Sequence, residues 1–238
     1  MALRGLRGDH TGLVTSCMRI VERHPASGSL WWLASRVLTA ADPVAEFSQV
    51  LAQAEGDRTE QHLADALPAD STVCVIGWPD LASDALVRRG DVSVLVVDAA
   101  GEGASFVNRL QRSDVDAECV SMSGAAAAAS AADLVLVEVS ACGADGVLAT
   151  SGSRAAAAVA YCSEIPVWAV AGVGRRLPAP MWAAVLGRLD AAGSPWDLDI
   201  EFVPAGTISH VVGPNGVVAG TGDLGRPECP VAPELLRA

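Results

Sequence analysis

The chain has 238 residues, of which 51% are hydrophobic but only 4% aromatic, so its core must be built mainly from Ala, Val and Leu. Its 28 acidic and 16 basic residues give a formal net charge of −12, which disfavours binding to a nucleic-acid backbone. Charged residues interrupt the apolar stretches before they reach the roughly 18–20 residues of a membrane span, and residues 1–10 lack the apolar core of a secretory signal. We therefore expect a cytoplasmic protein that binds neither nucleic acid nor a membrane.

The six cysteines are widely spaced, with no C-x-x-C pair and no histidine at metal-ligand spacing. Such isolated thiols are typical of a protein kept in a reducing compartment. We expect free thiols, no metal site and no cofactor.

Residues 1–68 are predicted to form a helical N-terminal domain. Apolar residues recur at helical spacing in 11–24, 27–41 and 42–67, with Asp42 as the N-cap of the last helix and Pro43 at its first position. The third helix is expected to continue to Pro68.

Residues 69–225 change to an alternation of short β-branched runs and helical segments, which predicts βαβ units and a mainly parallel sheet. The strands are nearly continuous in apolar character, as expected when helices cover both faces of the sheet. The predicted strands are 72–77, 93–98, 117–122, 134–140 and 166–171, and the helices between them are 80–90, 102–114, 123–133 and 153–164. Residues 200–219 are expected to add strands and turns, and residues 226–238 to form an irregular tail. The fold class is therefore α/β, with a Rossmann-like domain after the helical part.

Ligands of an open parallel sheet bind outside the carboxyl ends of its strands. Hydroxyls and glycines gather there, and the N–H groups at a helix start favour an anion. The expected ligand-binding residues are Gly77, Trp78, Asp98, Ser123, Gly124, Thr150, Ser151, Gly152, Ser153 and Arg154.

The same residues also have a structural interpretation. Ser and Gly before an alanine run are ordinary helix caps, which stabilise a helix by about 1 kcal/mol without any ligand. Asp98 at a strand end can likewise cap the next helix. Gly101-Glu102-Gly103 lacks the third glycine of a dinucleotide fingerprint, which disfavours that class of site. Both interpretations of the Thr150–Arg154 turn stay open at this point.

The segment from Asp133 to Ala171 resembles a known family. The family pattern is an apolar strand, G-A-D-x-[IV], N-K-I-G-T, an alanine-rich helix and I-P-[VFY] before another strand. This chain has an apolar strand, then Gly143-Ala144-Asp145, the turn at 150–154, an alanine-rich helix and Ile165-Pro166 before another strand. This pattern is that of the initiation factor 2B α/β/δ subunits, methylthioribose-1-phosphate isomerase and ribose-1,5-bisphosphate isomerase. The likeness covers about residues 70–220.

The resemblance implies a Rossmann-like domain of the kind found in ribose-5-phosphate isomerase and CoA-transferases, and a homodimer. It also implies a catalytic role for Asp145, which matches the aspartate that works with a cysteine in the isomerases. The chain departs from the family at that cysteine, whose place is held by Gly77, and at the N-K pair, which is replaced by Ala149 and Thr150.

These departures favour an altered, non-catalytic member that binds a small phosphorylated metabolite at the carboxyl edge of the sheet. Two alternatives remain: a sugar-phosphate aldose–ketose isomerase that uses Asp145, and a structural dimerisation module in which Asp145 only caps the corner.

Overall fold

The alternation of apolar runs and helical segments produces a seven-stranded sheet in the computed structural model, which describes residues 10–236. The strand order is β10-β9-β7-β4-β1-β2-β3, and all neighbouring pairs are parallel except β9 and β10. The bounds are β1 (Thr72–Ile76), β2 (Ser93–Asp98), β3 (Asp116–Ser121), β4 (Leu134–Glu138), β7 (Val167–Val170), β9 (His210–Gly213) and β10 (Gly216–Ala219). The predicted α/β class with a mainly parallel sheet is confirmed.

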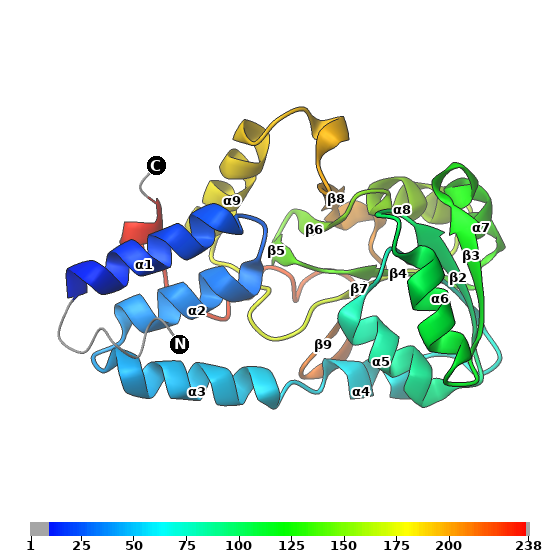
Figure 1. Ribbon diagram of the computed structural model, residues 1–238, viewed down its shortest axis with the longest axis horizontal. Coiled ribbons are helices and arrows are strands. Elements are labelled where there is room, and N and C mark those ends of the chain that lie inside the picture. Colours follow the sequence, from blue (N-terminus) through cyan, green and yellow to red (C-terminus); the bar gives the residue numbers. More distant parts are fainter. Residues whose placement is uncertain (1–9, 237–238) are drawn as a thin grey trace.

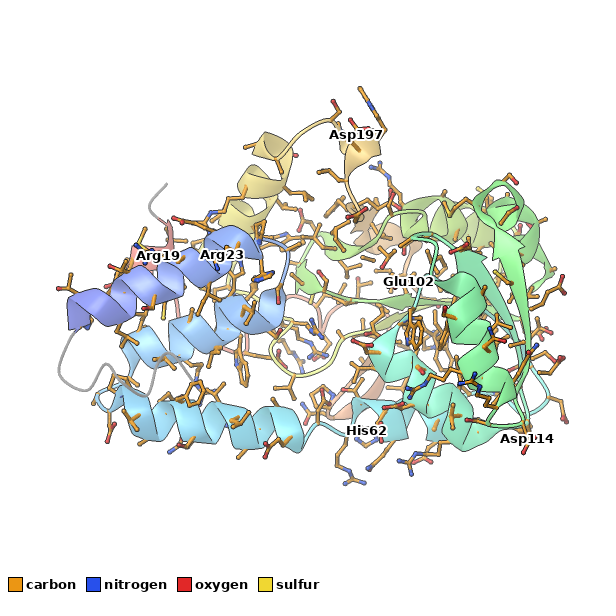
Figure 2. The ribbon with its side chains drawn as sticks, in the orientation of Figure 1. Arg19, Arg23, His62, Glu102, Asp114 and Asp197 are labelled. Carbon is orange, nitrogen blue, oxygen red and sulfur yellow. The ribbon has the colours of Figure 1, made fainter. Side chains whose placement is uncertain are left out.

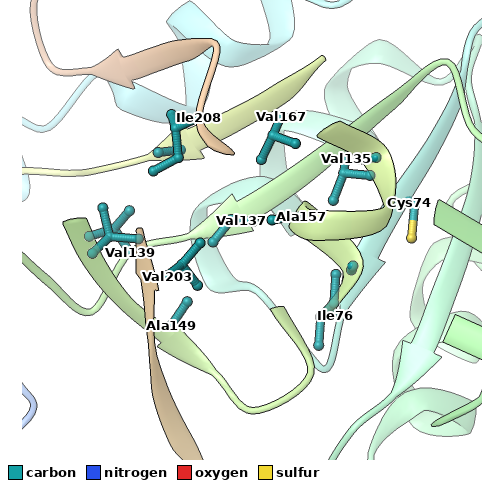
Figure 3. Close-up of a cluster of buried hydrophobic side chains, with 14 of the residues drawn as sticks. Cys74, Ile76, Val135, Val137, Val139, Ala149, Ala157, Val167, Val203 and Ile208 are labelled. Carbon is teal, nitrogen blue, oxygen red and sulfur yellow. The ribbon is translucent and has the colours of Figure 1, made fainter. Parts of the chain in front are cut away.

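Helices cover both faces of this sheet (Figure 1). Side chains alternate along a strand, so Val73 and Val75 of β1 face one layer of helices while Cys74 and Ile76 face the other. The first layer contains α4 (Thr59–Ala66), α5 (Asp80–Arg89) and α6 (Gly103–Gln111), and the second contains α7 (Ala125–Ala131) and α8 (Ser153–Cys162). The second layer is rich in alanine, which lets its helices pack close to the strands (Figure 3).

A second sheet has three strands, two of which lie between β4 and α8 in the chain, whereas the third follows α9 (Ala179–Ala191). Its order is β5-β6-β8, with β5 (Ala141–Gly143), β6 (Gly146–Thr150) and β8 (Ile200–Pro204) all antiparallel. No strand is predicted between residues 140 and 153, so β5 and β6 are absent from the prediction. Short apolar runs on either side of Ala144 and Asp145 pair with each other, and β8 adds a third strand.

The N-terminal helices lie at the opposite end of the molecule from α6 and α7 (Figure 1). They are α1 (His10–Arg23), α2 (Gly28–Thr39) and α3 (Pro43–Glu55). The Asp42 carboxylate accepts N–H bonds from Val44 and Ala45, as the sequence predicts for an N-cap. The predicted single helix over 42–67 is divided into α3, which ends with Gly56 as its C-cap, and α4, which begins at Thr59. The Asp57 carboxylate accepts both the N–H and the hydroxyl of Thr59 at this start. No helix in the described part of the chain is long and apolar enough to cross a bilayer.

No element is predicted for residues 172–199, yet α9 (Ala179–Ala191) forms there and packs against the N-terminal helices. Its prolines, Pro178 and Pro180, stand at the helix start, where proline is tolerated. The chain after β10 returns to the same helices, where Cys229, Ala232 and Leu235 are buried. One apolar cluster thus joins α1, α2 and α9 with the C-terminal segment.

Arg176 fastens this C-terminal segment to the loop after β7. Its guanidinium is buried and lies 3.0 Å from carboxylate oxygens of both Asp223 and Glu228. The Glu228 carboxylate also accepts N–H bonds from Gly174 and from Arg176 itself. Two acids of the C-terminal segment are therefore held by one cation.

We expect Arg176→Met to lower the free energy of unfolding by about 3 kcal/mol, because it leaves two partly buried carboxylates without their cation. Urea denaturation measures the change. Arg226→Met is the matched control, since Arg226 pairs with the same Asp223 but its side chain is 81% exposed. That exposed pair should contribute less than about 1 kcal/mol. Equal losses in the two variants would contradict the role of Arg176.

Candidate functional site

A cavity of about 200 Å³ opens where the chain reverses its path across the sheet. From β1 the chain moves through β2 to β3 in one direction, whereas β4, β7 and β9 follow in the other. The loops after β1 and β4 diverge at this point and leave a crevice, which is the usual ligand position in an open α/β sheet. The cavity is lined by Trp78 and Pro79 after β1 and by Glu138 and Ser140 at the end of β4.

Four further polar residues line the cavity from other elements. Asp80 begins α5, Thr150 ends β6, Ser153 begins α8, and Arg175 lies in the loop after β7. The Arg175 guanidinium is half-buried, and its Nη1 donates to the Ser140 carbonyl oxygen over 3.3 Å. Its Nε is buried and has no hydrogen-bond partner among the described residues. The lining therefore combines one cation, Arg175, with hydroxyl groups and with the carboxylates of Asp80 and Glu138.

Glu138 closes one side of the cavity and caps α5. One carboxylate oxygen accepts the N–H of Asp80 and the other that of Ala82, each over 3.1 Å. Burial raises the pKa of Glu138 from 4.5 to about 7, although these two N–H groups and Arg175 act in the opposite direction. A carboxyl group that titrates near neutral pH inside a cavity can exchange a proton with a bound ligand.

Ser140 connects the cavity to the helical region. Its hydroxyl donates to the Ala26 carbonyl oxygen over 2.6 Å, and its own carbonyl oxygen accepts the N–H of Gly28 over 2.8 Å. The approach is so close that a Cβ on Gly28 would lie 2.8 Å from that oxygen. The start of α2 is thus fixed to the end of β4 at the wall of the cavity.

The start of α8 already binds a carboxylate that belongs to the chain. Oε1 of Glu201, in β8, accepts the N–H of Gly152 over 2.6 Å and that of Arg154 over 2.9 Å. Gly152 has a φ of +98°, which side-chain-bearing residues rarely adopt. The N–H groups that were predicted to bind an anion at the start of this helix are therefore occupied. Of the turn at 150–154, only Thr150 and Ser153 line the cavity.

Asp145 lies apart from these residues, in the turn between β5 and β6. It is exposed, does not line the cavity, and accepts a hydrogen bond from the Trp182 indole over 2.5 Å. The residues that follow the end of β4 are instead Glu138 to Ser140. The G-A-D string at 143–145 matches the family pattern in letters, but it forms the turn of the β5–β6 hairpin and does not line the cavity.

The other predicted residues are divided between structural positions and the cavity. Trp78 lines the cavity, whereas Asp98 caps α6 by accepting the Gly103 N–H over 3.0 Å. Gly77 has a φ of +68° and makes the turn after β1. Ser123 and Gly124 lie in the short helical turn before α7, outside the cavity lining.

The sequence did not point to Glu138, Arg175 or Glu201. Glu138 had a detectable signal, since it is the one charged residue in the apolar run 134–140. Arg175 reaches the site through the loop after β7, and Glu201 reaches it through the pairing of β8 with β6. Local sequence patterns encode neither arrangement.

Cys74 faces α7 and α8 inside the sheet, and burial raises its pKa to about 12, so it supplies no thiolate. All six cysteines are free, and the described residues contain no cluster of three potential metal ligands.

Comparison with solved structures shows which known proteins have a similar fold. The translation initiation factor eIF-2B from Pyrococcus horikoshii OT3 superposes with a TM-score of 0.74 at 14% identity, over 91% of this chain and 86% of that chain. The fold is that of the initiation factor 2B subunits. The tetrameric eIF2B-beta2-delta2 complex from C. thermophilum gives a TM-score of 0.72 at 17% identity, over 90% and 77% of the two chains. eIF2B beta from Chaetomium thermophilum gives 0.63 at 18% identity, over 88% and 72%.

The resemblance predicted from residues 133–171 is thus confirmed at the level of the fold. No family model matches the sequence, and no curated protein does. At these identities the likeness to initiation factor 2B extends to the fold alone, so the site must be interpreted from its own residues.

The pKa of Glu138 predicts a pH-dependent stability. Its pKa in the folded chain, about 7, is above its ordinary value of 4.5, so protonated Glu138 stabilises the fold at low pH. This contribution is complete below pH 4.5 and is lost as the pH rises through 7. The stability of the natural chain relative to Glu138→Gln should therefore fall between these values by on the order of 3 kcal/mol. Urea denaturation at several pH values measures it, and a constant difference would contradict the assignment.

Proposed function

We propose that the chain is an altered, non-catalytic relative of the initiation factor 2B subunits that binds a small phosphorylated metabolite in the cavity between β1 and β4. The observation that carries this proposal is the half-buried Arg175 side chain, which lines the cavity and forms no ion pair with any residue between 10 and 236. A cation without an ion-pair partner at the wall of a cavity attracts an anionic ligand.

The groups around Arg175 support the same class of ligand. Thr150 and Ser153 supply hydroxyls beside the guanidinium, and Arg–phosphate pairing is among the stronger charge-assisted hydrogen bonds. The α5 and α8 amides are taken by Glu138 and Glu201, so the anion depends on side chains rather than on a helix start. This favours a ligand with one phosphate group.

The size of the cavity limits the ligand further. At about 200 Å³ it is smaller than the roughly 300–1,000 Å³ of sites that bind drug-sized molecules. A pentose phosphate fits this limit better than a dinucleotide. Ribose 5-phosphate, inorganic phosphate and uncharged ribose are therefore the appropriate probes.

We expect ribose 5-phosphate at 100 times its dissociation constant to stabilise the protein by about 2.7 kcal/mol, which corresponds to a rise in Tm of about 5–10 °C. Ribose should give no rise, and Arg175→Gln should abolish the effect of ribose 5-phosphate. Thermal unfolding followed by circular dichroism measures the shifts.

Arg154→Ala is the matched control, because Arg154 is exposed and lies outside the cavity lining. This variant should keep the full shift. If Arg154→Ala loses the shift while Arg175→Gln keeps it, the ligand binds at the α8 start instead. If the natural chain shows no shift with any phosphate, the structural dimerisation role is favoured.

Sugar-phosphate isomerisation is a second candidate function, which the near-neutral pKa of Glu138 favours. In that case Glu138 is the proton-transferring group, since Asp145 does not line the cavity. Ribose 1,5-bisphosphate and methylthioribose phosphate are the substrates to test. Glu138→Gln should reduce kcat/KM by at least about 100-fold, and Asp145→Asn should leave it unchanged. Absence of turnover by the natural chain, or dependence on Asp145, would exclude this mechanism.

A further inference from the structure

A second cavity of about 190 Å³ lies beside the first at the carboxyl edge of the sheets. Ala99, which follows β2, and Thr150 and Ser151, which follow β6, form one wall. The opposite wall is the segment between α9 and β8, which contributes Trp196, Asp197 and Asp199. Thr150 lines both cavities, so the two are neighbours.

Trp196 is unlike the other tryptophans of the chain. Its side chain is 82% exposed, whereas Trp31, Trp32, Trp168 and Trp182 are buried in the core clusters. The sixth, Trp78, is partly buried against Phe106. Packing within the chain therefore does not account for Trp196, whose indole lines the wall of a cavity instead.

The charge around this indole is negative. Asp197 and Asp199 flank the cavity, and neither forms an ion pair with any residue between 10 and 236. Figure 2 shows Asp197 at the edge of the molecule, on the segment that connects α9 with β8. The backbone holds this segment in place, because the Ser151 N–H donates to the Asp199 carbonyl oxygen over 2.8 Å.

We propose that the second cavity binds a small organic cation, an ammonium group with methyl or methylene substituents. The negative face of an indole attracts such a cation, and tryptophan is the most effective aromatic side chain for this contact. Two unpaired carboxylates beside the indole add attraction for a cation and repel an anion. Arg175 lines the first cavity but not the second, so the sign of the favoured ligand differs between them.

The experiment compares choline with 3,3-dimethylbutan-1-ol, which has the same shape and no charge, at constant ionic strength. The readout is acrylamide quenching of tryptophan fluorescence, because acrylamide is neutral and reaches an exposed indole first. We expect choline to reduce the quenching constant of the exposed component at least twofold in a saturable manner, and the alcohol to have no effect. Trp196→Leu should remove that component and its response.

The carboxylates are tested with the double variant Asp197→Asn, Asp199→Asn, which should weaken choline binding about tenfold. The matched control is Glu55→Gln, Asp65→Asn, which removes the same charge from exposed positions on α3 and α4 and should bind as the natural chain does. Equal protection by choline and the alcohol, or no protection by either, overturns the proposal. Unchanged binding in the double variant also overturns it. Choline does not require Arg175, so these outcomes are independent of the phosphate site.

Discussion

The arrangement of the carboxyl edge depends on carboxylates of the chain itself, which occupy backbone N–H groups at the starts of its helices. Glu138 caps α5, Glu201 caps α8 and Asp98 caps α6. In the loop after β7, Asp57 and Glu228 accept the N–H groups of Val173 and Gly174. Helix starts attract anions, so an acidic chain with a net charge of −12 fills these positions internally. Because these N–H groups are occupied, an anion at this edge could be contacted only by side chains.

Two of these carboxylates also join the parts of the molecule. Asp57 lies between α3 and α4 and contacts the loop after β7, while Glu228 draws the C-terminal segment to the same loop. Ser140 adds a third connection, from the end of β4 to the start of α2. Hydrogen bonds therefore attach the helical region next to the cavity, through the same loops that form the cavity wall.

The sheet could be predicted from the sequence because each of its buried strands is a local apolar run, and the helices between them have the spacing that a parallel crossover requires. The β5–β6 hairpin could not, since its strands are stable only through pairing with β8, about 50 residues later. The same limit applies to the site. Trp78 follows a predicted strand, and Thr150 and Ser153 stand at the start of the predicted helix 153–164, so local patterns identify all three. Arg175 is brought to the cavity by tertiary packing alone.

The position of Asp145 shows that a short match in sequence does not by itself bring a side chain to the crevice. Its three-letter context matches the family pattern, but the backbone around it forms a hairpin whose carboxylate binds the Trp182 indole instead of lining the cavity. Glu138 and Arg175 stand at the crevice in its place, one with a pKa raised by burial and one with an unpaired donor. The scaffold fixes where a ligand can bind, whereas these two side chains and their solvation decide what it is. Likeness of fold at 14% identity therefore leaves the chemistry of the crevice to be decided by its own side chains.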